Sequence, residues 1–277
     1  SVLAAPTSAS SSTSTQLTIV HNAIPIAGTP TNFLVIVNDV EQGKITGHID
    51  DLGIYHDRIL HMIIIGEDLK IFVHIHTEDL GPVTPEMKKE GKFPLRYTFT
   101  KAGHYTIVVN YIQGGRELSQ QSFLEVGGEP AMEKGVAARS VPDQSLTKDF
   151  DSYRVNLEKP DTLKSGVMQK ITYTIEKDNQ SVTDLEPYLG AAMHLAVVRA
   201  DLGRVIHTHG QVYLPGSAFF QQLFQNYVNY HSHFVPDHFG PKIQAQITFP
   251  QPGLYQIFGE FKVGGKVLVT SFMVKVK

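Results

Sequence analysis

The feature that most constrains this sequence is an internal repeat, because a chain with two copies of one pattern folds into two related domains. Both copies contain an Asp-Leu pair, a tyrosine, a single histidine and a His-x-His motif. In the first copy these are Asp51-Leu52, Tyr55, His61 and His74-Ile75-His76. In the second copy, 133 residues later, they are Asp184-Leu185, Tyr188, His194 and His207-Thr208-His209.

Matched segments further along set the predicted boundaries. Gly114-Gly115 and the preceding residues 99–105 recur 150 positions later, so the second copy contains about 17 extra residues. We predict a flexible Ser/Thr-rich tail at 1–16, a first domain at 17–128, a linker at 129–147 and a second domain at 148–277.

Each copy has the residue pattern of an antiparallel β-sandwich. Segments such as 33–37, 71–75 and 105–109 are rich in β-branched and aromatic residues, and Gly, Pro and Asp punctuate the chain between them. We therefore predict an all-β protein of two tandem immunoglobulin-like domains. The exception is an insertion in the second copy at 211–238, where residues 217–230 are expected to form a short helix.

The composition excludes several classes of protein. The chain has no cysteine, so it holds no disulfide, thiol nucleophile, iron–sulfur cluster or cysteine-ligated zinc. Its 24 Lys and Arg against 27 Asp and Glu argue against a nucleic-acid partner. No apolar run is long enough for a membrane span. The 13 histidines are left as the principal metal-binding or proton-transfer groups.

The repeated histidines lie on strands that we expect to form a hairpin. A turn at Gly66-Glu67-Asp68-Leu69 would place His61 directly opposite His74, with His76 on the same face. The core face would then carry Met62, Ile64, Leu69, Ile71, Val73 and Ile75. The second copy would likewise place His194 opposite His207 and beside His209. Directly paired Cβ atoms lie about 4.5–5.5 Å apart, so three imidazoles can converge on one ion.

This pattern predicts a transition-metal site in each domain, with His61, His74 and His76 as ligands in the first and His194, His207 and His209 in the second. Imidazole ligands suit copper, zinc, nickel or iron, and three of them leave a coordination position open. Further candidate ligands are His56 in the first copy and His231, His233 and His238 in the insertion. The alternative interpretation is that the histidines are structural residues inherited from a common ancestor.

Three functions follow from these residues. The first is a metal-binding protein that sequesters, delivers or senses copper, with zinc as the alternative ion. The second is a metalloenzyme with hydrolytic or redox chemistry at the open position, for which Asp237 is the candidate general base. The third is a metal-free adhesion or interaction module that binds a protein partner through 219–239.

The second copy resembles the YtkA-like domains of exported bacterial proteins. The likeness lies in residues 184–194, in His207-Thr208-His209, and in 239–241 with 249–255. The first copy resembles a more divergent relative over 30–126. The resemblance implies immunoglobulin-like sandwiches associated with copper outside the cytoplasm, and the same six histidines as ligands.

Features near the N-terminus and a sequon in the second half of the chain also favour a secreted or extracytoplasmic protein. The chain begins at Ser1 without an initiator methionine and continues into a low-complexity Ser/Thr tract. Asn179-Gln180-Ser181 is a glycosylation sequon. We expect an exported protein on this basis.

Overall fold

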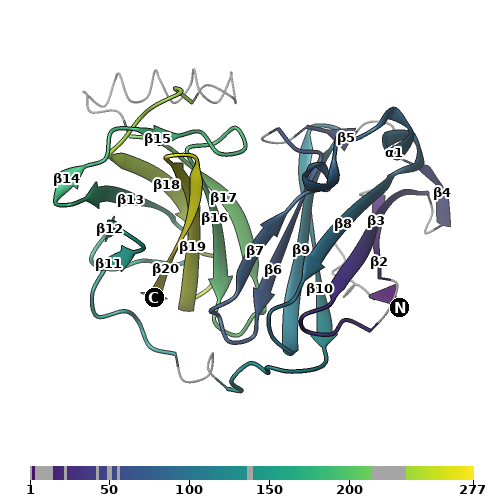
Figure 1. The fold of residues 1–277 in the computed structure, drawn as a ribbon, viewed down its shortest axis with the longest axis horizontal. Coiled ribbons are helices and arrows are strands. Elements are labelled where there is room, and N and C mark those ends of the chain that lie inside the picture. The colour runs from purple at the N-terminus through teal and green to yellow at the C-terminus, as the bar shows by residue number, and fades with distance from the viewer. Residues whose placement is uncertain are drawn as a thin grey trace. The chain divides into compact units, whose positions relative to one another are not determined.

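A computed structural model describes residues 2–3, 15–21, 24–41, 44–48, 52–54, 57–135, 140–213 and 235–277. The chain divides into two compact units, unit 1 at Ser1–Ala137 and unit 2 at Ala138–Lys277. Each unit is built almost wholly from antiparallel strands (Figure 1). The predicted all-β fold class, with two sandwich domains in tandem, is confirmed.

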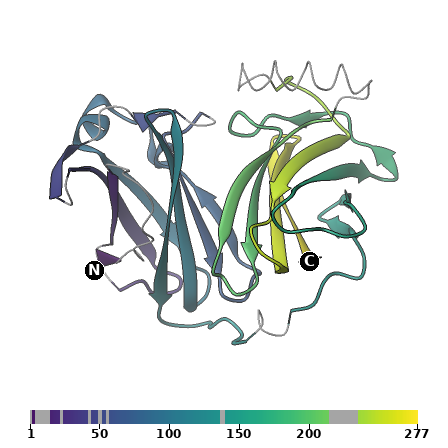
Figure 2. The same ribbon diagram turned by 180° about the vertical axis from the view of Figure 1, so that it is seen from behind.

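Unit 1 consists of two five-stranded sheets, seen from the other side in Figure 2. One sheet contains β1 (Val2–Leu3), β2 (Thr15–His21), β3 (Pro30–Glu41), β4 (Lys44–His48) and β8 (Lys92–Thr98). The other contains β5 (Leu52–Gly53), β6 (Leu60–Gly66), β7 (Phe72–Ile75), β9 (Gly103–Gln113) and β10 (Arg116–Val126). A 3₁₀ helix η1 (Thr77–Leu80) and a short helix α1 (Pro85–Glu90) connect β7 to β8.

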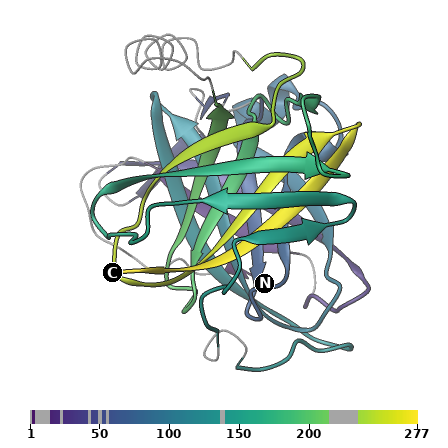
Figure 3. The same cartoon turned by 90° about the vertical axis from the view of Figure 1, so that its left-hand side faces the viewer.

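Unit 2 repeats this arrangement as one continuous ten-stranded sheet folded into two layers, so that β12 and β13 cross in front of β19 and β20 in Figure 3. Its strands are β11 (Thr147–Phe150), β12 (Tyr153–Glu158), β13 (Met168–Lys177), β14 (Gln180–Ser181), β15 (Leu185–Glu186), β16 (Met193–Arg199), β17 (Val205–Val212), β18 (Lys242–Thr248), β19 (Gly253–Val263) and β20 (Lys266–Val276). The layers are continuous because β17 changes partner at Gly210, which pairs with Met193 of β16 and with Ala245 of β18.

Alternation along the strands gives each unit its own core. On β6, Met62 and Ile64 are fully buried in the core of unit 1, and Ile71, Val73 and Ile75 of the facing segment pack against it. This is the core face that the sequence predicts, except that Leu69 lies in the hairpin loop with a left-handed φ of 54° and is not part of that core. The matched Gly-Gly pairs close the β9–β10 and β19–β20 hairpins, and all four glycines have φ between 53° and 74°. Two-residue hairpin loops need this left-handed conformation, which glycine adopts without a steric penalty.

The predicted register of the histidine hairpin is wrong by two residues. His74 faces Ile63, and Met62 faces Ile75, so that His61 faces His76 one position further along. In unit 2, His194 pairs with His209, and His207 pairs with Ala196. Because side chains alternate with a period of two, the shift leaves every histidine on the predicted face.

The shift arises from a four-residue loop where a two-residue loop was predicted. Gly66 N donates to Ile71 O (3.0 Å), and Leu69 takes up a left-handed φ of 54°. Asp68 Oδ1 accepts a hydrogen bond from Lys70 N at 2.9 Å. Unit 2 repeats this loop, with Leu202 at φ 60° and Asp201 Oδ1 accepting from Gly203 N at 3.0 Å. Leucine rarely takes up a left-handed conformation, so nothing in the sequence predicts this four-residue loop.

Two other predictions concern the ends of the domains. Residues 4–14 of the predicted tail lie outside the described residues, whereas Val2–Leu3 pair with β2, and β2 itself begins at Thr15. The predicted helix at 217–230 also lies outside the described residues. The division between the units falls within the predicted linker.

Candidate metal centre

The three histidines of unit 1 lie close together on one face of the β6–β7 hairpin. His61 is on β6, His74 is on β7, and His76 follows the end of β7. All three side chains are buried, with 0%, 8% and 2% of their surface exposed. The hairpin therefore brings together the three residues that the sequence singles out, on the face opposite the core.

One nitrogen of each ring points at the same spot. His61 Nδ1 lies 2.9 Å from His74 Nε2 and 3.1 Å from His76 Nε2, and the two Nε2 atoms are 3.0 Å apart. These atoms form a nearly equilateral triangle, which we call the unit 1 triangle. Three imidazole nitrogens converging in this way are a donor set that could hold a transition metal ion.

A carboxylate lies behind one of the three rings. Asp79 Oδ2 is 3.6 Å from His76 Nδ1 and accepts a hydrogen bond from the His76 backbone N–H at 2.8 Å. Partial burial raises the pKa of Asp79, but the contacts with His76 and the positive charge of Arg58 together outweigh burial, so that the pKa lies below its ordinary value. A carboxylate on Nδ1 favours the tautomer with its proton there, which leaves the Nε2 lone pair facing the triangle.

Unit 2 holds its three histidines in a similar way. His194 Nδ1 lies 3.4 Å from His207 Nε2. The ring centroid of His209 is 4.6 Å from those of both His194 and His207. The His194–His207 and His194–His209 rings are stacked and edge-on respectively, as are the corresponding rings in unit 1. The sequence repeat therefore corresponds to a repeat in side-chain geometry.

A backbone carbonyl fixes the tautomer of His194. Its Nε2 lies 3.0 Å from Tyr188 O, and a carbonyl can only accept a hydrogen bond, so Nε2 carries the proton. The Nδ1 lone pair of the neutral ring then faces His207. A tight turn presents this carbonyl: Leu189 and Gly190 have φ of 49° and 72°, and Tyr188 and Ala191 exchange backbone hydrogen bonds.

Each unit contributes buried histidines that could serve as metal ligands: His61 and His74 in unit 1, and His194 and His207 in unit 2. The other candidate ligands and the candidate general base are not part of these clusters in the described residues. His56, His231 and His233 lie outside the described residues. His238 and Asp237 are exposed, and neither contributes to the histidine clusters. Most of the proposed partner surface at 219–239 also lies outside the described residues.

Sequence reasoning missed one polar side chain beside each cluster. In unit 2, Glu260 of β19 is the direct cross-strand partner of His194, and in unit 1 Asn110 of β9 is the direct partner of His61. Both are buried, with 5% and 3% of their surface exposed. They are 150 positions apart, the spacing of the Gly-Gly pairs, but they differ in residue type and so do not stand out as a repeat.

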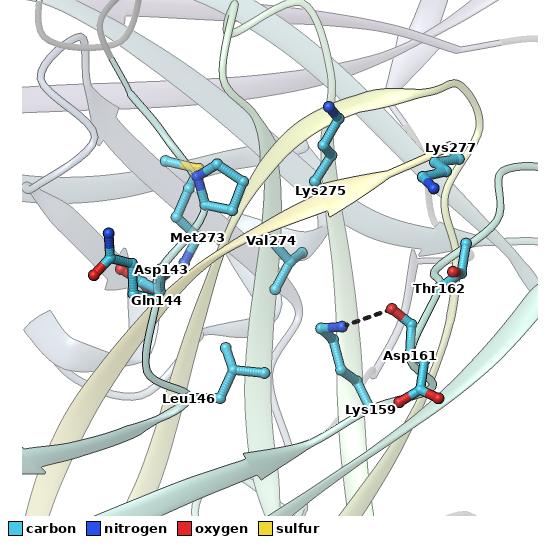
Figure 4. A pocket seen from close by; sticks show the side chains of 11 residues that line it. Asp143, Gln144, Leu146, Lys159, Asp161, Thr162, Met273, Val274, Lys275 and Lys277 are labelled. Carbon is cyan, nitrogen blue, oxygen red and sulfur yellow. Dashed lines mark hydrogen bonds between the residues drawn. The ribbon is translucent and has the colours of Figure 1, made fainter.

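A surface pocket of unit 2 lies apart from its histidines (Figure 4). It is lined by residues of the segment before β11, of the segment after β12 and of β20, among them Asp143, Lys159 and Lys275. Lys159 Nζ there donates to Asp161 O at 3.5 Å. No histidine lines it, so the histidine clusters remain the chemically distinctive feature of both units.

Each unit is thus an antiparallel β-sandwich with a buried cluster of histidines on one hairpin. The chain belongs to the family described as "Domain of unknown function (DUF8832)", whose model matches residues 13–128 and residues 148–277. No curated protein matches the sequence.

Two of the solved structures that match this chain are distantly similar to it. Red sea bream transglutaminase is 12% identical with a TM-score of 0.24, over 96% of this chain and 32% of that one. A putative membrane-anchored protein from Corynebacterium diphtheriae is 11% identical with a TM-score of 0.24, over 93% of this chain and 56% of that one. This chain therefore spans about a third and just over half of these two proteins. In the described part of the chain, no helix combines the length and apolar character needed to cross a bilayer.

Proposed function

We propose that this protein binds a transition metal ion in each unit, copper by preference, and that it sequesters, delivers or senses the ion outside the cytoplasm. The ligands are His61, His74 and His76 in unit 1. In unit 2 they are His194, His207 and His209. The observation that carries the proposal is the unit 1 triangle, with its three nitrogen atoms 2.9–3.1 Å apart.

Protons alone account poorly for this triangle. A neutral imidazole has one N–H, and an N–H aimed along one edge of the triangle cannot also bridge the other two. At least one pair of lone pairs then faces each other in a buried site, where unsatisfied polar groups are costly. A cation at the centre satisfies all three lone pairs at once, and Asp79 supports the tautomer of His76 that such a cation requires.

The size of the triangle also suits a metal ion. Edges near 3 Å place its centre about 1.7 Å from each nitrogen, and metal–imidazole bonds are about 2.0–2.1 Å long. His61, His74 and His76 would hold such an ion through three nitrogen atoms, which leaves a coordination position for a further ligand. That open position suits transfer of the ion to a partner protein or binding of a small molecule.

Chemistry and resemblance favour copper over the other ions. Imidazole ligands suit both copper and zinc, and a given nitrogen site generally binds Cu²⁺ more tightly than Zn²⁺. The resemblance to YtkA-like domains supports copper handling, and the Ser/Thr tract and the sequon at Asn179 support export. Zinc is the alternative ion.

Metal analysis of untagged protein tests the proposal. Wild type is compared by mass spectrometry with His74→Ala/His76→Ala and with His207→Ala/His209→Ala, after incubation with copper or zinc and removal of excess ion. We expect about two equivalents in wild type and one in each variant, while His238→Ala, an exposed control, keeps both. Absence of bound metal and of uptake from either ion would overturn the proposal and favour the interaction module.

A further inference from the structure

The ligands of unit 1 lie at the open end of their hairpin. Among the described residues, the last backbone pair of β6 and β7 is Met62 with Ile75, and His61 and His76 occupy the next opposed position. His76 itself follows the end of β7 at Ile75. Backbone pairing therefore supports these two ligands from one side only.

Unit 2 supports the corresponding ligands from both sides. His194 and His209 are a direct backbone pair, and the pair of Met193 and Gly210 follows one position further out. β17 then continues into its ladder with β18. The open end of the unit 1 hairpin is closed in a different way.

A side chain closes the open end in unit 1. Ile59 N donates a hydrogen bond to Glu78 Oε1 at 3.0 Å. Ile59 lies two residues before His61, and Glu78 lies two residues after His76. The bond therefore crosses the hairpin in the register of the ladder, and the two ligands lie between it and the last backbone pair.

Glu78 is held firmly in this position. It belongs to η1, in which Asp79 N donates to His76 O at 3.2 Å and Gly81 N donates to Glu78 O at 3.1 Å. Ile59 is 2% exposed, and the second oxygen of the Glu78 carboxylate, Oε2, is buried. A charged acceptor makes a stronger hydrogen bond than a neutral one, and exclusion of water preserves it. The bond can therefore replace the further backbone pair that unit 2 has at this point.

We propose that Glu78 is a positioning residue of the unit 1 metal centre, which holds His76 opposite His61 through Ile59 and so slows release of the ion. This inference rests on the proposed metal-binding function. Without the Glu78–Ile59 bond the end of the hairpin frays, and His76 is the first ligand to leave because it lies beyond the last backbone pair. The other two histidines lie within β6 and β7 and stay in place.

Loss of this bond has a different signature from loss of a charge. Glu78→Ala removes the acceptor, so that fewer metal-free molecules hold all three ligands in place, and the apparent affinity falls in proportion to that fraction. Loss of a group that orients a ligand typically lowers metal affinity about 10–100-fold, and we expect about 10-fold because Asp79 still contacts His76. Glu78→Gln keeps an oxygen acceptor and removes only the charge, so we expect it to bind within about twofold of wild type. A carboxylate that acted through its charge would make the two variants equally weak.

The experiment uses the full chain in the His207→Ala/His209→Ala background, which leaves only the unit 1 centre. Competition titrations with Cu²⁺ and Zn²⁺ measure affinity, and transfer of the ion to an excess of chelator measures the release rate, which should be faster in Glu78→Ala. Glu86→Ala removes an exposed carboxylate of α1 and is the matched control, which should bind as the background protein does. Hydrogen exchange followed by NMR needs no variant at Glu78, because the bond predicts a protected Ile59 amide in the metal-free protein.

The outcomes separate this inference from the function beneath it. If the background protein binds neither ion, the proposed function fails at unit 1 and the inference with it. If it binds, but Glu78→Ala is as tight as the background or Glu78→Gln is as weak as Glu78→Ala, the function stands and the inference is wrong. An Ile59 amide that exchanges as fast as in an open chain would also refute it, even if Glu78→Ala does not fold. A loss of affinity in Glu78→Ala that Glu78→Gln restores would support it.

Discussion

Replacing His61 with leucine should stabilise the metal-free protein and destabilise the metal-loaded one. His61 Nδ1 belongs to two edges of the unit 1 triangle, 2.9 Å to His74 and 3.1 Å to His76. Its removal leaves one edge, 3.0 Å between His74 and His76, which a single proton can bridge. Because a buried, unsatisfied acceptor costs about 1–3 kcal/mol, we expect His61→Leu to raise the apo stability of unit 1 by about 1–2 kcal/mol.

Added metal should reverse the order of stability of wild type and His61→Leu. An ion at 100 times its dissociation constant stabilises the wild-type unit by about 2.7 kcal/mol, whereas the variant, with only two ligands, gains little. For a domain of this size, 1 kcal/mol corresponds to roughly 4 °C. Calorimetry without metal should therefore place the unit 1 transition of the variant about 4–8 °C above wild type, and calorimetry with metal should place it below.

A second buried histidine of unit 1 provides the control. His21 on β2 is 4% exposed and contacts the ring of Phe33 edge-on, with centroids 6.4 Å apart. It lies on a different strand from the triangle, so His21→Leu should not reverse the order of stabilities on adding metal. If His61→Leu and His21→Leu lower the apo transition equally, and metal still raises that of His61→Leu, the reasoning from the triangle is refuted.

Three further predictions test the surroundings of the site and the fold. Asp79→Asn should lower the metal affinity of unit 1 about 10–100-fold, measured by competition titration, and leave unit 2 unchanged. Gly210→Ala should destabilise unit 2 by about 1–3 kcal/mol in urea unfolding, because a Cβ there would lie 2.5 Å from Ile243 Cγ2; an unchanged midpoint would contradict this. Burial raises the pKa of Tyr105 to about 12. Its contribution to the free energy of unfolding is therefore complete below pH 10 and is lost as the pH rises towards 12. In urea unfolding at a series of pH values, Tyr105→Phe should show a smaller loss of stability over this range than wild type.

Sequence reasoning identified the faces of the hairpin but not its register. Alternation alone places His61, His74 and His76 on one face of the hairpin and Met62 and Ile64 on the other. A register shift of two residues leaves each side chain on the same face. The register depends on how the loop closes, which is decided by the left-handed Leu69 and by the Asp68 carboxylate. Leucine carries no signal for such a conformation, so a two-residue loop was the natural prediction.

Glu260 could not be predicted for a different reason. Its place beside His194 depends on the pairing of β16 with β19, strands that are separated by β17 and β18 along the chain. A search for identical residues in the two copies also passes over it, because its counterpart Asn110 is a different residue. Asp79 could have been proposed from the sequence, because it lies only three residues after His76. Its importance becomes visible only when η1 turns it back onto the ring.

The continuity of β17 has a consequence for the rate at which each proposed metal centre would take up and release its ion. His207 and His209 lie within a strand that is hydrogen-bonded to β16 and continues into the ladder with β18. His76, by contrast, lies beyond the end of β7, and its backbone N–H donates to the Asp79 carboxylate. A ligand at the end of a ladder frays more readily than one inside it. We therefore expect slower amide hydrogen exchange around the unit 2 ligands, and faster capture and release of the ion in unit 1.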